Sequence, residues 1–237
     1  MADLFVIDFK SSNSVYDEYL TQVSCYLRMY NHSHWKLSDP WEPATRAGIL
    51  RLDKETGLLD DPAVVEVTDI EERWQAFLGL REYYRHILEP KAKQDRWYKD
   101  GDKRYVTITT VLGCLDKPAL VQWAANMTVE YFKENAKDMT TPEQIEYHLK
   151  KAKTAYRTMS KKAMDIGSIV HDAIHAYLSG AKPEPILEGQ DKAQNSFLAF
   201  LEWADKVKLK PVALEKVLID PVHEVGGTCD FIGWAEI

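Results

Sequence analysis

Residues 4–10 read LFVIDFK, an apolar run that carries an aspartate and a lysine two positions apart. A short apolar run bounded by the polar residues SSNS predicts a buried strand. Side chains alternate across a strand, so Val6, Asp8 and Lys10 share one face. A carboxylate and an ammonium then project side by side from a strand that is otherwise built for burial. Taken alone, a plain ion pair at the end of a strand is the commoner explanation of this arrangement.

The composition around this stretch is that of an ordinary globular protein. The chain has 237 residues, of which 45% are hydrophobic and 28% charged, which suits one domain or one domain with a helical extension. It lacks a run of about 18 apolar residues, so we expect no membrane span. The first residues do not combine a basic segment with an apolar one, so we expect no secretory leader and a cytoplasmic location.

Charge and cysteine content exclude some functions. The net charge of −7 argues against a protein that coats nucleic acid non-specifically, but it is compatible with an enzyme that binds DNA in a local basic channel. Cys25, Cys114 and Cys229 are scattered and form no CxxC pair. Free thiols in a reducing cytosol are the simplest interpretation, and we expect no iron–sulfur cluster.

The remaining patterns predict a mixed α/β chain whose helices gather in the middle. The polar segment 90–105, PKAKQDRWYKDGDKRY, indicates an exposed joining loop. In chain order we expect a strand at 4–9, a helix at 15–31, a hairpin at 47–68, a helix at 70–88, this loop, helices near 118–136, 142–160, 161–179 and 190–207, and strands at 212–219 and 228–236.

Two further carboxylates fall within the predicted C-terminal strands. Asp230 lies in GGTCDFIGW, just after two glycines and between residues that are not typical of turns. An isolated buried carboxylate costs several kcal/mol unless a cation or hydrogen-bond donors meet it. Glu215 alternates with Ala213 and Val217, so we expect it on the buried face of its strand. A turn aspartate and an edge-strand glutamate are the ordinary alternatives.

Two predicted helices carry polar residues one turn apart. Gly167 and His171 lie on one side of the helix DIGSIVHDAIHAYL, and His175 completes an HxxxH pair. A zinc protease needs a glutamate directly after the first histidine, where this chain has Asp172, so we reject that function. Gln22 and Tyr26 flank the apolar stripe of the helix that follows the first strand. Each of these features alone is more often structural than functional.

Together these residues resemble the RecB-like branch of the PD-(D/E)XK nuclease superfamily. That family combines a helix with Gly-x-x-x-His, a strand glutamate, a Gly–Asp strand, a strand with Asp-x-Lys and a following helix with Gln-x-x-x-Tyr. The corresponding segments here are GSIVH at 167–171, Glu215, GTCD at 227–230, DFK at 8–10 and QVSCY at 22–26. VTITTVLGCLDKPALVQWA at 106–124 is also similar to the N-terminal segment of phage and mitochondrial exonucleases of this branch. The resemblance covers nearly the whole chain.

The order of the motifs departs from the family pattern. In the family the Asp-x-Lys strand follows the Gly–Asp strand directly through a hairpin, whereas here the two lie near opposite ends of the sequence. We therefore expect a circularly permuted nuclease whose new termini lie at the hairpin turn, a tolerated place for such a cut, and a natural or an engineered permutation fits equally. The expected single domain, 1–237, comprises 1–89 as the second half of the nuclease core, 90–105 as the joining loop, 106–160 as a helical extension and 161–237 as the first half.

The resemblance implies a metal site that binds Mg²⁺ or Mn²⁺, as one or two ions. Asp8 and Asp230 would be the main ligands, and a further ligand, His171, tilts the preference towards Mn²⁺. Lys10 would orient or deprotonate the attacking water, or stabilise developing negative charge. Glu215 would hold a water molecule or Lys10, completing a catalytic set of Lys10, Asp8, Asp230 and Glu215.

The implied substrate is DNA. Gln22, Tyr26, Ser11 and Ser12 would contact the strand near the scissile phosphate, and the carbonyl of Phe9 is a further expected metal ligand. The resemblance favours an exonuclease that acts on DNA ends, mainly single-stranded, in replication, recombination or repair. A flap or branched-DNA endonuclease and a non-catalytic DNA-end-binding protein are the alternatives. We expect a monomer without a membrane partner, in a prokaryotic or phage-infected cell.

These expectations have a geometric form. Residues 4–9 should pair antiparallel with residues 229–236, and Met1 should lie close to Ile237. Asp8, Asp230 and His171 should converge on one metal position.

Overall fold

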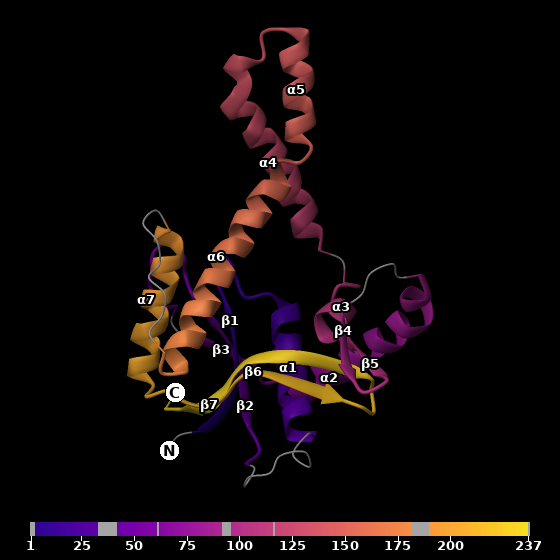
Figure 1. Cartoon of the computed structure of the whole chain (residues 1–237), viewed down its shortest axis with the longest axis vertical. Helices are drawn as coiled ribbons and strands as arrows, with labels where there is room; N and C mark the ends of the chain where they lie inside the picture. The colour runs from indigo at the N-terminus through magenta and orange to yellow at the C-terminus, as the bar shows by residue number, and fades with distance from the viewer. Residues whose placement is uncertain are drawn as a thin grey trace. The chain divides into compact units, whose positions relative to one another are not determined.

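The computed structural model describes residues 3–32, 42–60, 62–91, 96–115, 117–181 and 190–236. The chain divides into two compact units. The first unit, Met1–Cys114 with Ile169–Ile237, contains the sheet, and the second, Leu115–Ser168, is helical. Figure 1 shows the elements of both units.

The first unit is built on a mixed open sheet of seven strands flanked by helices (Figure 1). Its strands run in the order β3-β2-β1-β7-β5-β4, and β6 pairs with β7. The β1–β2 and β5–β7 pairs are parallel and the other pairs are antiparallel. The strands are β1 (Asp3–Lys10), β2 (Arg46–Arg51), β3 (Val64–Glu66), β4 (Trp97–Asp100), β5 (Lys103–Thr107), β6 (Lys210–Asp220) and β7 (Val225–Ala235).

The central strand β1 is buried between neighbours, as its continuous apolar sequence predicts. It runs parallel to β2 and antiparallel to β7, with a register from Asp3 opposite Ala235 to Ile7 opposite Phe231. The expected antiparallel pairing of the segments 4–9 and 229–236 is therefore confirmed, over residues 3–7 and 231–235. The expected closeness of Met1 and Ile237 falls outside the described residues.

Helices pack against both faces of this sheet. Leu4 and Val6 of β1 join a core with helices α1 (Asp17–His32), α2 (Ile70–Tyr83) and α3 (Ile108–Leu112). A π-turn, Tyr84–Leu88, and a 3₁₀ turn, Glu89–Lys91, extend α2. Phe9 packs instead on Phe200 of helix α7 (Asp191–Lys206), with 5.5 Å between ring centroids. The alternation of β1 thus divides its side chains between two cores.

The prediction of a joining loop at 90–105 is wrong over most of that segment. Residues 97–107 form the β4–β5 hairpin, which turns at Gly101 with a φ of +62°. The charged residues around Trp97 and Tyr98 concealed the strands, because β4 and the start of β5 are largely exposed and need no continuous apolar face. The expected hairpin at 47–68 is confirmed by the antiparallel β2–β3 pair.

The second unit contains α4 (Pro118–Asn135), a 3₁₀ turn (Ala136–Asp138), α5 (Pro142–Ala152) and the first part of α6 (Ala155–Leu178). Thr141 and Gln144 form a capping box that begins α5. Tyr131 of α4 bonds to His148 of α5 over 3.0 Å between Oη and Nδ1. The expected helical extension at 106–160 therefore begins later, because residues 106–114 belong to the sheet unit.

Two expected helices are divided differently from the prediction. The pattern at 142–160 ends as α5 at Ala152, and α6 begins at Ala155 and continues through the predicted break to Leu178. The predicted helix at 190–207 is confirmed as α7. Among the described residues, no helix is long and apolar enough to cross a membrane.

Candidate metal centre

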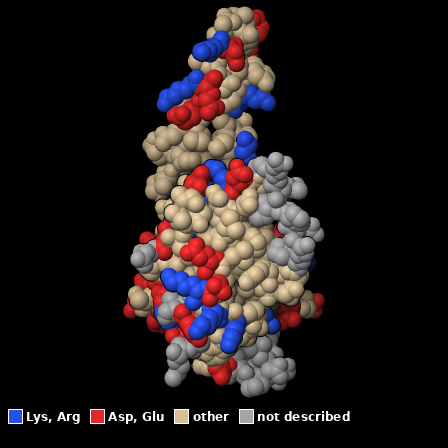
Figure 2. Space-filling model, turned by 90° about the vertical axis from the view of Figure 1, so that its left-hand side faces the viewer, with Lys and Arg blue, Asp and Glu red and all other residues tan. Residues whose placement is uncertain are grey.

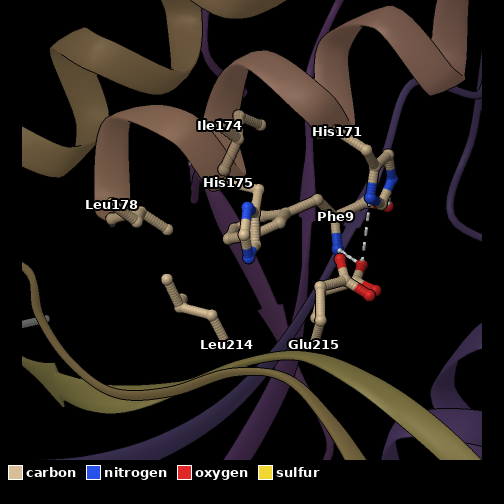
Figure 3. Close-up of a pocket in the computed structure, with 8 residues that line it drawn as sticks. Phe9, His171, Ile174, His175, Leu178, Leu214 and Glu215 are labelled. Atoms are coloured by element: carbon tan, nitrogen blue, oxygen red, sulfur yellow. Dashed lines mark hydrogen bonds and ion pairs between the residues drawn. The ribbon is translucent and has the colours of Figure 1, made fainter. Parts of the chain in front are cut away.

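Three side chains from three elements of the first unit gather into one group suited to a cation. They are His171 of α6, Glu215 of β6 and Asp230 of β7, and one ligand atom from each lies within 4.8 Å of the others. Figure 3 shows His171 pointing down from its helix and Glu215 pointing up from its strand towards the same place. Opposite ligands of an octahedral Mg²⁺ are about 4.2 Å apart, so a small closing movement would fit one ion.

Asp230 is the centre of the group. Its Oδ2 accepts a hydrogen bond of 3.0 Å from the backbone N–H of Phe9 and lies 3.7 Å from Nδ1 of His171. Burial raises the pKa of Asp230 well above its ordinary value, and the neighbouring carboxylates of Asp8 and Glu215 raise it further. Lys10 and the N–H of Phe9 act in the opposite direction without cancelling this effect. The site therefore has a deficit of positive charge.

His171 is held at its other ring nitrogen. Nε2 lies 3.1 Å from the carbonyl oxygen of Phe9, and the two rings meet edge to face at 6.3 Å. When Nε2 carries the proton it donates to this carbonyl, and Nδ1 is left unprotonated towards Asp230. When Nε2 is unprotonated, the same 3.1 Å matches two neighbouring ligands of one ion, which are about 3 Å apart.

Glu215 reaches the group through an unusual backbone conformation. It falls opposite Asp230, between the Leu214–Phe231 and Lys216–Cys229 pairs, and its φ is +45°. A non-glycine residue in this left-handed region costs about 1–2 kcal/mol. The prediction that Glu215 occupies a buried face is wrong, because its residue is exposed and the buried positions of β6 are Leu218 and Asp220. β6 pairs along one side of β7, so much of it faces solvent.

Asp8 and Lys10 form an ion pair beside the group. Nζ of Lys10 is 2.6 Å from Oδ2 of Asp8 and 5.0 Å from the ring centroid of Tyr19 on α1. Burial lowers the pKa of Lys10, but the carboxylates of Asp8 and Asp230 outweigh it and raise the pKa above its ordinary value. Lys10 is therefore a cation at neutral pH, and their shared strand face is as predicted.

Asp8 is not among the three residues of this group. It follows the Ile7–Phe231 pair of β1 and β7, and its carboxylate is close enough to raise the pKa of Asp230. Its expected role as a metal ligand stays a prediction. Oδ2 of Asp8 is buried, and the ammonium of Lys10 is its charged partner. Glu215, which the sequence assigned to a water molecule or to Lys10, is the second carboxylate of the group.

The charges around the group fit a divalent cation. Three carboxylates, those of Asp8, Glu215 and Asp230, lie near one ammonium, that of Lys10. Two carboxylate oxygens and one imidazole nitrogen are a donor set that suits Mn²⁺ and, less strongly, Mg²⁺. The raised pKa of Asp230 is consistent with a missing positive charge.

Gln22 and Tyr26 are placed differently from the prediction. They do not flank the apolar stripe, because both are buried, with 8% and 3% of their surface exposed. Nε2 of Gln22 donates to Oη of Tyr26 over 2.7 Å. Tyr26 fills the space over Gly227, where an added Cβ would lie 2.4 Å from a ring carbon. The two motif residues thus pack behind the strands that carry Asp8 and Asp230 and do not form an exposed binding surface.

Ser11 and Ser12 lie directly after β1 and are partly exposed. The hydroxyl of Ser12 donates to the carbonyl of Ser14 over 2.7 Å. The structure gives neither serine a contact with the metal group, and their expected role in binding DNA stays a prediction.

No family model, curated protein or solved structure matches the chain. The chemistry of the site therefore carries the functional conclusion.

A small cavity adjoins the group and was not expected from the sequence. Its lining combines the acidic ligands with an apolar wall (Figure 3). At about 10 Å³ it has room for about one water molecule. His175, singled out only as part of an HxxxH pair, contributes to this lining. The lining residues are Phe9, His171, Ile174, His175, Leu178, Leu214, Glu215 and Asp230.

Proposed function

We propose that the protein is a divalent-metal-dependent deoxyribonuclease of the PD-(D/E)XK type. The observation that carries the proposal is the gathering of His171, Glu215 and Asp230 beside the Asp8–Lys10 pair. Phosphodiester hydrolysis needs a cation to neutralise charge on the phosphate and a positioned water molecule. A mixed sheet with acidic ligands and a lysine on adjacent strands supplies the first need directly.

The neighbouring strands support the proposed permutation. β1 carries Asp8 and Lys10, β7 carries Asp230, and the two strands pair antiparallel. Two strands joined by a hairpin would have the same relation, although here most of the sequence separates them. This arrangement is the one that a circularly permuted member of the family would have.

His171, Glu215 and Asp230 would hold the metal ion, for which we propose Mn²⁺ or Mg²⁺. When bound, the ion would polarise the scissile phosphate and lower the pKa of a coordinated water molecule. The backbone N–H of Phe9 orients the carboxylate of Asp230, and the carbonyl of Phe9 fixes the ring of His171. Hydrogen bonds of this kind keep ligands in one geometry.

Lys10 is protonated, as a residue that stabilises negative charge must be. Its raised pKa keeps the ammonium protonated, so it supplies positive charge and does not accept a proton. Asp8 holds Nζ of Lys10 within 2.6 Å and so fixes where that charge lies. Of the roles expected for Lys10, stabilisation of negative charge on the phosphate is the one that this electrostatic environment favours.

We further propose that the enzyme is an exonuclease acting on single-stranded DNA ends. This finer assignment is supported by the resemblance in sequence alone. Flap or branched-DNA endonucleolytic cleavage is the alternative that a circular substrate distinguishes, because a closed circle has no end.

The test combines metal binding with cleavage. Mn²⁺ at 100 times its Kd should stabilise the folded protein by about 2.7 kcal/mol, which raises the melting temperature by about 5–11 °C for a chain of this size. Asp230→Asn and His171→Ala should abolish this rise, whereas Asp172→Asn, on the same helix but outside the group, should keep it.

The cleavage assay uses end-labelled linear DNA, single- and double-stranded, with either metal. We expect linear DNA to be degraded with Mn²⁺ or Mg²⁺, and Lys10→Ala and Asp230→Asn to be inactive. Wild-type protein that binds Mn²⁺ but cleaves none of these substrates would refute the nuclease assignment. Cleavage of circular single strands would replace the exonuclease with an endonuclease.

A further inference from the structure

The helical unit has a charge opposite to that of the whole chain. Residues 115–168 contain nine lysines and arginines and seven aspartates and glutamates, although the protein as a whole has a net charge of −7. The excess is concentrated between Glu146 and Asp165, where six basic residues occur without an acidic one. All six are exposed: Lys150, Lys151, Lys153, Arg157, Lys161 and Lys162.

Most of these cations have no carboxylate partner. Lys150 pairs with Glu146 over 2.7 Å. No other ion pair among the described residues involves a member of the basic set, so five positive charges face solvent with nothing to neutralise them. Figure 2 shows Lys and Arg side chains projecting from the helical unit beside acidic ones.

Helix stability explains the position of some of these cations but not that of Arg157. Lys150 and Lys151 end α5, where positive charge is favourable because the carbonyl end of a helix is partially negative. Arg157 lies in the first turn of α6, which has no acidic residue. Positive charge is unfavourable at that end of a helix. The position of Arg157 is therefore consistent with a partner that supplies negative charge.

Two tyrosines accompany the basic residues. Arg157 bonds through Nε to Oη of Tyr156 over 3.1 Å, and its guanidinium lies 5.7 Å from the ring centroid. Nζ of Lys151 lies 5.6 Å from the ring centroid of Tyr147, which is 56% exposed. Basic side chains interleaved with accessible aromatic rings are the combination that binds a single strand, since cations contact phosphates and rings stack on bases.

We propose that the segment 147–162 is a binding surface for the phosphate backbone and bases of single-stranded DNA. The choice of DNA as the partner rests on the proposed function, whereas the surface itself rests on charge, exposure and the tyrosines. The surface belongs wholly to the helical unit, so its binding should not require the metal centre.

The experiment measures binding of a fluorescent 20-nucleotide DNA strand by anisotropy in EDTA. The test variant is Lys153→Glu/Arg157→Glu/Lys161→Glu. The matched control, Lys99→Glu/Lys103→Glu/Lys206→Glu, makes the same charge change at exposed positions of the sheet unit. Circular dichroism and melting curves check folding, and Arg157→Glu should if anything suit its place at the start of α6.

We expect the test variant to lose at least tenfold in affinity and the control to change by less than threefold. Each phosphate contact on a single strand contributes about 0.7 to the slope of log affinity against log salt, so the slope should fall by about 2 in the test variant and stay unchanged in the control. Equal effects in both variants, or a wild-type protein that does not bind the strand, would overturn the proposal.

Failure of this surface and failure of the nuclease assignment give different results. If wild-type protein cleaves DNA but the test variant binds as the control does, the surface is refuted and the nuclease stands. If binding depends on the surface but no cleavage occurs with either metal, the nuclease assignment is refuted and the binding surface stands. Tighter binding by tenfold or more to RNA of the same sequence, or to vesicles containing anionic lipid, would refute DNA as the partner.

Discussion

Replacing Gly227 by alanine tests the link between the metal-bearing strand and α1. A Cβ at this position would lie 2.4 Å from Cε1 of Tyr26 and 3.2 Å from Cδ1 of Ile108. Tyr26 is buried and bonded to Gln22 over 2.7 Å, so its ring cannot move away without losing that bond. Overpacking of this kind costs about 1–3 kcal/mol of unfolding free energy. For a chain of this size the melting temperature should fall by about 2–12 °C.

The control is Gly79→Ala in α2. Gly79 is exposed, and an added Cβ would meet no atom within 4 Å. Alanine in a helix interior is about 0.5–1 kcal/mol more favourable than glycine, so the melting temperature should rise by about 1–4 °C. Scanning calorimetry measures both variants. In a double-mutant cycle, Tyr26→Leu should remove most of the cost of Gly227→Ala. A stabilised Gly227→Ala variant, or additive effects of the two substitutions, would refute the packing argument.

Three further results follow from single side chains. Burial raises the pKa of the Cys25 and Cys229 thiols well above the ordinary value, so Ellman's reagent at pH 8 should modify Cys114 alone until the protein is unfolded, and rapid reaction of two or three thiols would contradict this. Glu215→Gly should raise the melting temperature in EDTA by about 2–8 °C, because it relieves about 1–2 kcal/mol of left-handed backbone strain, and should abolish the rise with Mn²⁺; a fall in EDTA would show that the conformation is unstrained. Asp220→Ala should lower the unfolding free energy in urea by at least about 2 kcal/mol, since the buried carboxylate accepts two backbone N–H groups of the β6–β7 turn, and an unchanged midpoint would contradict that role.

Strong local patterns were sufficient to predict much of the fold. The apolar run 4–9 fixes β1, since only a strand with neighbours on both sides buries such a sequence completely. Periodic apolar residues likewise predicted α1, α2 and α7. The resemblance, through the order of its motifs, placed β1 beside β7. Local patterns predicted none of the exposed β4–β5 hairpin, whose strands have charged residues on their outer positions.

The sequence named residues that gather around Asp230 but not their geometry. Asp8 and Lys10 pair beside Asp230, and His171 and Glu215 form a group with it. Their expected roles stay predictions. Which carboxylate joins His171 and Asp230 depends on the backbone conformation at Glu215. A left-handed glutamate has no signature in the sequence.

The burial of the Gln-x-x-x-Tyr pair was equally hidden. Tyr26 is buried because Gly227, about 200 positions away in the chain, leaves room for its ring. A contact of this kind depends on the tertiary fold and cannot be found from the periodicity of one helix.

The backbone conformation at Glu215 also bears on whether its side chain has a function. A glutamate in a left-handed conformation is held there against its own preference, and glycine or asparagine would occupy the position more easily. Lys208 and Glu224 also have a positive φ, so the conformation alone does not mark a functional residue. At Glu215 it coincides with a carboxylate that joins His171 and Asp230. In a relative that keeps the β6–β7 pair, a glutamate retained at this position in spite of its backbone would support the proposed metal site, and a glycine there would argue against it.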